Sequence, residues 1–210
     1  MQTKFESIDF QGVSGTIAAK IFSPSQQIKK CAVVFPGAGY AFSEPLLRYP
    51  IQCLIQKNYQ VIALDKIYGS DPAWRNLTIE ADARKVVEDD TDLVYSQIVA
   101  KYGPPDLLFG RSLGTFAIAC LLEKKMAQPK QIVWQTPALG SKWSVMRDCG
   151  SPGFGILGTA DYYYQPAIEH LPKDRIIIEN ADHAMEIPGD PIASVEILKQ
   201  IVVATNDWIL

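Results

Sequence analysis

The sequence predicts an α/β fold in which a mostly parallel sheet carries helices on both faces. From residue 31 onward, short apolar segments typical of strands alternate with longer segments of helical periodicity, and this alternation is typical of parallel sheets. The predicted strands are continuous apolar runs, which favours a sheet that is buried on both faces. The 210 residues show no internal repeat and no break in composition, so we expect one domain over residues 1–210.

The first elements are predicted as follows. Residues 3–10 and 14–22 are expected to form an antiparallel hairpin, joined through Gln11 and Gly12. A polar loop leads to a strand at 31–35, which is followed by a helix at 44–57 and a strand at 59–64. After a loop at 71–76, the segment 78–100 is expected to be a helix with Ile79, Ala83, Val86, Val87, Val94 and Ile98 on one face.

The second half of the chain continues the alternation. Strands are predicted at 105–109, 131–134, 153–157 and 175–179, and helices at 113–126 and 165–171. A last helix begins near Pro191, and its pattern predicts an apolar stripe formed by Val195, Leu198, Ile201, Val202 and Trp208.

Composition and charge exclude several classes of function. The net charge of −3 provides no basic surface for nucleic acid or for an anionic membrane. No apolar run approaches the roughly 20 residues of a membrane span, and the N-terminus does not resemble a signal peptide. Cys31, Cys53, Cys120 and Cys149 are widely spaced, so we expect a reduced, cytoplasmic protein without structural disulfides or zinc. The acidic residues Glu88, Asp89, Asp90 and Asp92 are expected to form a solvated helix face.

The motif that carries chemistry is Gly110-Arg111-Ser112-Leu113-Gly114, between a predicted strand and a predicted helix. A G-x-S-x-G sequence at such a junction predicts a sharp turn that exposes the serine hydroxyl as a nucleophile. Glycine is needed on both sides because side chains would collide across the turn. The alternative is an ordinary serine N-cap of the following helix.

A serine nucleophile needs a base and an acid, which we expect at the carboxyl ends of strands. His183 directly follows the strand at 175–179, whereas the other histidine, His170, lies at the end of a predicted helix. Asp161 follows the strand at 153–157 and is the preferred acid. Asp182 is the main alternative, although the immediate neighbour of a histidine rarely reaches its ring nitrogen. Further candidates in predicted loops are Asp148, Asp174 and Asp190.

The end of the strand at 31–35 provides a candidate oxyanion loop. Pro36-Gly37-Ala38-Gly39-Tyr40 follows it directly, and small residues allow backbone N–H groups to face a developing negative charge. The alternative is a simple glycine loop without a catalytic role.

The order Ser112, Asp161, His183, with the serine in G-x-S-x-G, resembles that of α/β-hydrolase-fold enzymes. The segments 35–40, 110–114, 157–161 and 181–183 carry the resemblance. The chain is most similar to the small, lidless branch that includes dienelactone-hydrolase-like proteins. It departs from dienelactone hydrolase in having a serine nucleophile, and Pro36 replaces the histidine of the common oxyanion motif. The resemblance implies oxyanion donors at Leu113 and at Ala38 or Gly39.

These residues predict a serine hydrolase that acts on a small carboxylic ester or thioester and needs no metal or organic cofactor. Acyl transfer, carbon–carbon hydrolysis and a non-catalytic binding role are the alternatives. The segment 136–152 is too short for a helical cap, so we expect an open site for a small-molecule acyl substrate. Tyr40, Arg111 and Trp134 are the predicted pocket residues; Arg111 is expected either to meet an anionic substrate or to pair with a structural carboxylate. Other aromatic candidates for its wall are Tyr68, Trp74, Trp143 and Tyr162–Tyr164.

Overall fold

A computed structural model of the protein describes residues 4–25, 27, 30–66, 68–70 and 80–210. These residues form an eight-stranded sheet in the order β1-β2-β4-β3-β5-β6-β7-β8. The strands are β1 (Lys4–Gly12), β2 (Gly15–Ser23), β3 (Lys30–Phe35), β4 (Tyr59–Leu64), β5 (Leu107–Arg111), β6 (Gln131–Gln135), β7 (Gly153–Gly158) and β8 (Asp174–Ile178).

The strand pairing confirms the predicted fold class. The hairpin strand β1 pairs with β2, and β2 pairs with β4, in antiparallel register. All other neighbouring strands, from β4 through β3 and β5 to β8, are parallel. The carboxyl ends of the parallel strands therefore meet at one edge, where the site is expected.

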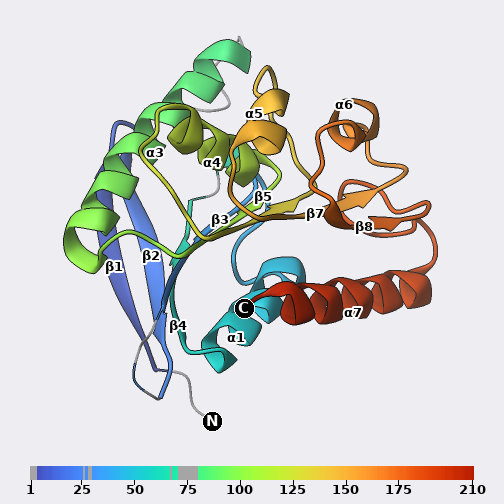
Figure 1. Ribbon diagram of the computed structural model, residues 1–210, viewed down its shortest axis with the longest axis horizontal. Coiled ribbons are helices and arrows are strands. Elements are labelled where there is room, and N and C mark those ends of the chain that lie inside the picture. Colours follow the sequence, from blue (N-terminus) through green and yellow to red (C-terminus); the bar gives the residue numbers. More distant parts are fainter. Residues whose placement is uncertain (1–3, 26, 28–29, 67, 71–79) are drawn as a thin grey trace.

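Helices cover both faces of the sheet (Figure 1). One face carries α3 (Glu80–Tyr102), α4 (Leu113–Glu123), α5 (Trp143–Asp148) and α6 (Tyr164–Ile168), and the other carries α1 (Pro45–Gln56) and α7 (Pro191–Trp208). A short 3₁₀ turn, η1, spans Tyr68–Ser70. None of the described helices is both long and apolar enough to cross a membrane.

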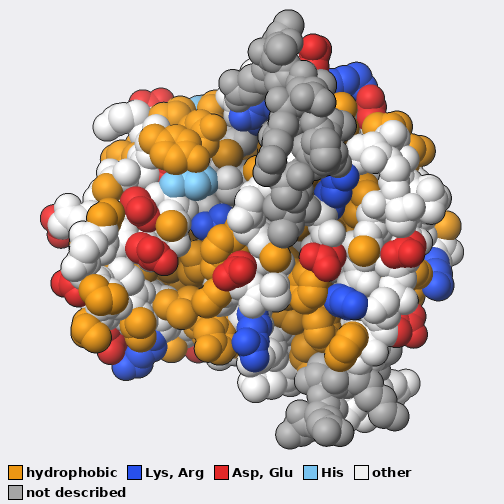
Figure 2. Space-filling model, turned by 180° about the vertical axis from the view of Figure 1, so that it is seen from behind, with side chains coloured by type: hydrophobic (Ala, Val, Ile, Leu, Met, Phe, Trp, Pro, Cys, Tyr) orange, Lys and Arg blue, Asp and Glu red, His pale blue; other side chains and the backbone are white. Residues whose placement is uncertain are grey.

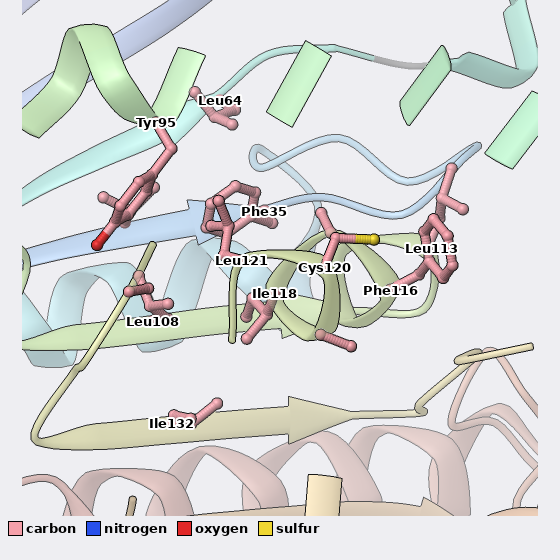
Figure 3. Packing of buried hydrophobic residues seen from close by; sticks show 14 of the residues in the cluster. Phe35, Leu64, Tyr95, Leu108, Leu113, Phe116, Ile118, Cys120, Leu121 and Ile132 are labelled. Atoms are coloured by element: carbon pink, nitrogen blue, oxygen red, sulfur yellow. The ribbon is translucent and has the colours of Figure 1, made fainter. Parts of the chain in front are cut away.

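Each face of the sheet has its own hydrophobic core. Figure 3 shows Leu108 and Ile132 of neighbouring strands beneath Ile118 and Leu121 of α4, and all four are fully buried. On the opposite face, Leu47 and Leu54 of α1 and Ile201 of α7 are fully buried as well. Each such side chain contributes about 1.5–3 kcal/mol through burial, so the two cores fix the sheet edge that carries the site.

Several details differ from the sequence predictions. The hairpin turns at Val13-Ser14, because Gly12 is already paired with Gly15. The segment expected to be one loop, 136–152, contains α5. In α7, Ile197, Ile201 and Thr205 face the core, and Val195, predicted to lie on the buried stripe, is 61% exposed. The predicted loop at 71–76 and residue Ile79 lie outside the described residues.

The acidic helix face is corrected at one residue. Asp90 is only 1% exposed, and its carboxylate accepts hydrogen bonds from Ser14 N–H, Ser14 Oγ and Tyr68 Oη. The hairpin and α3 lie so close together here that a Cβ on Gly12 would be 2.4 Å from Asp90 Oδ1. The neighbouring Glu88 and Asp92 are ion-paired with Lys124. Asp90 therefore anchors α3 to the N-terminal hairpin.

Candidate active site

Ser112 lies on the sharp turn between β5 and α4, as the motif predicts. Its φ is 50° and its ψ is −117°, a combination that L-residues rarely adopt. The close approach of the chain explains the flanking glycines: a Cβ on Gly110 would lie 2.8 Å from Gly114 O, and one on Gly114 would lie 2.1 Å from Phe35 O. The Ser112 side chain forms no N-cap hydrogen bond to α4, so the capping alternative is wrong.

Ser112, His183 and Asp161 form one hydrogen-bonded line. Nε2 of His183 lies 2.8 Å from Ser112 Oγ, and Nδ1 lies 2.8 Å from Asp161 Oδ2. Asp161 is 4% exposed, and its other oxygen accepts a hydrogen bond from the N–H of Tyr163 at 2.8 Å. The loops after β5, β7 and β8 thus bring the three predicted residues together.

Asp182, the alternative acid, forms its hydrogen bonds within its own loop, whereas Asp161 contacts the His183 ring. Asp182 Oδ1 accepts hydrogen bonds from the N–H groups of Ala184 and Glu186, so it shapes the loop that carries His183. The other aspartate candidates also have partners elsewhere: Asp148 is paired with Arg147, Asp174 accepts from Trp208, and Asp190 caps α7. His170 lies just beyond α6, as predicted.

The loop after β3 lies beside the serine. A Cβ on Gly37 would lie 3.5 Å from Ser112 Cβ and 3.4 Å from Tyr40 Cβ. Leu113 begins α4, where the unpaired N–H groups of a helix carry a partial positive charge. Among the described residues, the N–H groups of Leu113, Ala38 and Gly39 donate to no backbone acceptor, and they stay candidate oxyanion donors.

Arg111 is buried directly behind the serine and is 4% exposed. Its guanidinium stacks on Tyr40, with Cζ 3.7 Å from the ring centroid, and Nη2 donates a hydrogen bond to the backbone carbonyl of His183 at 3.3 Å. Burial lowers the pKa of this guanidinium from its usual value. Arg111 therefore connects the β3 loop to the His183 loop, and it is too enclosed to meet a substrate.

The aromatic residues predicted for the pocket lie in different surroundings, and two of them flank His183. The His183 ring lies 4.6 Å from the Tyr162 ring and 5.8 Å from the Tyr163 ring, between centroids. Trp134 is wrong as a pocket residue: it is fully buried in the core on the α4 face of the sheet. Tyr68 donates its hydroxyl hydrogen bond to Asp90, and Trp143 packs near Tyr163. Trp74 lies outside the described residues.

A surface groove of about 510 Å³ opens next to this arrangement. Tyr40 lies in its wall, and the rest comes from the start of α1, the loop after His183 and the first turns of α7. Its lining residues Met185 and Ile187 were missed by the sequence reasoning, because no motif marks them and their partners in α1 are distant in the chain. Leu198 was predicted only as part of the apolar stripe of the last helix. Figure 2 shows a histidine ring at the surface near hydrophobic side chains, with acidic side chains on the same face.

Among the described residues, no group of three His, Cys, Asp or Glu side chains is placed to hold a metal ion.

Comparison with solved structures identifies the architecture. A lidless α/β serine hydrolase from Xanthomonas campestris aligns over 100% of this chain and 97% of its own, with a TM-score of 0.66 and 15% identity. A putative α/β hydrolase from Agrobacterium tumefaciens aligns over 97% and 94%, with a TM-score of 0.72 and 13% identity. A cold-adapted esterase from an Arctic intertidal metagenomic library aligns over 100% and 96%, with a TM-score of 0.68 and 14% identity. No family model and no curated protein sequence matches the chain.

Proposed function

We propose that this chain, whose fold is that of the α/β hydrolases, is a serine hydrolase of small carboxylic esters or thioesters. The observation that carries the proposal is the hydrogen-bonded line from Ser112 Oγ through His183 to the buried Asp161. Nucleophile, base and orienting acid are arranged in this way in Ser-His-Asp catalysis on unrelated folds. The similarity to named esterases and serine hydrolases supports the same class at the level of the fold.

Acylation begins when Ser112 Oγ attacks the carbonyl carbon of the ester and His183 Nε2 takes the hydroxyl proton. The carbonyl π bond opens, and its oxygen becomes the oxyanion, which the N–H of Leu113 and that of Ala38 or Gly39 stabilise. The oxyanion then re-forms the carbonyl as the carbon–oxygen or carbon–sulfur bond to the leaving group breaks, and the leaving group takes the proton from His183. Asp161 holds Nδ1–H and stabilises the imidazolium.

Deacylation repeats these steps with water as the nucleophile. His183 takes a proton from the water, the hydroxide attacks the acyl carbon, and the bond to Ser112 breaks. Ser112 recovers the proton, and the carboxylic acid leaves. Tyr162 and Tyr163 flank the His183 ring at 4.6 and 5.8 Å and limit the orientations that it adopts during both steps.

The test is hydrolysis of 4-nitrophenyl acetate and an acetyl thioester by the wild type and by Ser112→Ala. Because the variant has no nucleophile, we expect kcat to fall by about 10³-fold or more. Ser96→Ala, at an exposed serine on α3, is the control and keeps full activity. Near-wild-type hydrolysis by Ser112→Ala, or failure of a fluorophosphonate probe to label Ser112, contradicts the proposal.

We also propose a cytoplasmic location. The four cysteines, Cys31, Cys53, Cys120 and Cys149, are all free thiols, which is typical of proteins that fold in a reducing compartment.

A further inference from the structure

We infer that the groove between α1 and α7 is a substrate subsite that selects esters carrying a positively charged group on an apolar chain. This inference rests on the proposed hydrolase function and adds a substrate class to it. The groove has a volume of about 510 Å³, which is within the range of small-molecule sites.

The groove borders the two loops that flank the proposed nucleophile. Tyr40 lines it, and the Cβ atoms of Tyr40 and Ser112 both lie within 3.5 Å of the position that a Cβ on Gly37 would occupy. Ala184 also lines it and directly follows His183, whose Nε2 is 2.8 Å from Ser112 Oγ. Because Arg111 fills the space where the β3 loop and the His183 loop meet, a chain attached to an acyl group on Ser112 enters the groove over Tyr40 and Ala184.

Most of the lining is apolar. Leu46 and Met185 are buried, and Ile187 and Leu198 are half-buried. Such a surface binds a hydrocarbon chain through the hydrophobic effect. The loop that contributes Met185 is held by Asp182, which accepts hydrogen bonds from the N–H groups of Ala184 and Glu186. The groove wall is thus preformed rather than assembled by the ligand.

The charge of the groove has one sign. Glu44 and Glu186 are its charged lining residues, both are exposed, and neither forms an ion pair with a described residue. Burial raises the pKa of the Tyr40 phenol, and the negative charges of Glu44 and Glu186 add to this rise. No Lys or Arg is among the described lining residues of the groove, and Arg111, which stacks on the Tyr40 ring, is 4% exposed. An ammonium group is attracted at this rim, and a carboxylate is repelled.

The experiment uses three 4-nitrophenyl hexanoate esters that are unsubstituted, ω-ammonium or ω-carboxylate. A parallel series of acetate esters carries the same three substituents on the alcohol. We expect kcat/KM to rank ammonium above unsubstituted above carboxylate in the series whose substituted chain enters the groove. The variant Glu44→Gln/Glu186→Gln is expected to reduce the ammonium-to-carboxylate ratio by about tenfold, because exposed charges interact modestly. The double variant Glu6→Gln/Glu169→Gln removes two exposed carboxylates outside the groove and keeps the wild-type ratio.

A second pair of variants tests whether the acyl chain occupies the groove, by measuring how turnover depends on the length of that chain. Val195 lines the groove and is 61% exposed, so Val195→Trp fills the groove without disturbing the core. It is expected to lower the ratio of hexanoyl to acetyl turnover, whereas Val203→Trp, at another exposed valine of α7, keeps that ratio.

The groove inference is overturned, and the proposed function stands, if hydrolysis depends on Ser112 but the groove variants change neither the order of the charged esters nor the dependence on chain length. If no ester is hydrolysed, the proposed function itself fails.

Discussion

Arg111 shows how much a single residue beside the nucleophile contributes to the site. Its guanidinium is buried, has no carboxylate partner among the described residues, and has an Nε without a hydrogen-bond acceptor. Its contacts are the ring of Tyr40 and the backbone carbonyl of His183. Burying a charge without an ion-pair contact is unfavourable, so this residue is better explained by positioning of the His183 loop than by stability.

Arg111→Met separates positioning from stability. Because methionine is apolar and unbranched, we expect the free energy of unfolding to stay constant or to rise by about 1 kcal/mol. Because the His183 carbonyl loses its donor, we expect kcat to fall by about tenfold to a hundredfold with little change in KM. Urea unfolding and steady-state kinetics measure the two effects. A loss of stability without a loss of kcat would show that Arg111 is structural.

The site residues were predictable from the sequence where chain order alone places them. Ser112, Asp161 and His183 each follow a strand, and parallel strands end at the same edge. Trp134 could not be assigned in this way, because a strand residue points to either face and only the register of β6 between β5 and β7 decides which. The stacking of Arg111 on Tyr40 joins residues that no local pattern connects.

Among the elements, α3 has an unusual attachment to the sheet. Asp90 accepts hydrogen bonds from two donors of Ser14 and from the hydroxyl of Tyr68. Its acidic neighbours indicated a solvated face, because the sequence does not show that the hairpin turn lies against this helix. The helix α5 was missed for a related reason: it is six residues long and has only Met146 buried, so its periodicity is too short to recognise.

Asp90→Ala tests this attachment. The substitution removes the acceptor of three partly buried hydrogen bonds, and we expect the free energy of unfolding to fall by about 2–4 kcal/mol. Asp89→Ala, at the neighbouring carboxylate that pairs with Lys85 on the surface, is expected to change it by less than about 1 kcal/mol. Urea titration followed by tryptophan fluorescence compares the two variants. Equal losses would mean that the hairpin contact contributes little.

At the scale of the whole molecule, the two cores contain ionisable groups that stay neutral when folded. Burial raises the pKa of the Cys31 and Cys120 thiols, and of the Tyr59 and Tyr95 phenols, to about 12. The usual values are 9.0 for the thiols and 10.0 for the phenols. The layered fold was predictable because it depends on the alternation of apolar segments, whereas these shifts depend on depth in the assembled core.

The protein is therefore expected to lose stability in alkaline solution. Between about pH 9 and 12 the unfolded chain releases protons that the folded chain retains, so the free energy of unfolding falls as pH rises. Each group that is ionised only in the unfolded chain lowers it by up to about 1.4 kcal/mol per pH unit. Urea unfolding at pH 8, 9.5 and 10.5 measures the slope, and Cys120→Ala is expected to make it shallower. A stability that is constant over this range would contradict the expectation.

The backbone at the edge of the sheet that carries the site is held in conformations that few residues adopt. Ser112, Thr136, Asn180 and Met185 have φ values of 50°, 42°, 59° and 63°, and each lies after β5, β6 or β8. Such conformations cost about 1–3 kcal/mol each. Glycine would relieve this strain at any of these four positions. Substitutions that stabilise the chain would therefore include the replacement of Ser112. Under the proposed function, selection for chemistry opposes that replacement, and a descendant without that selection is expected to lose Ser112 while gaining stability.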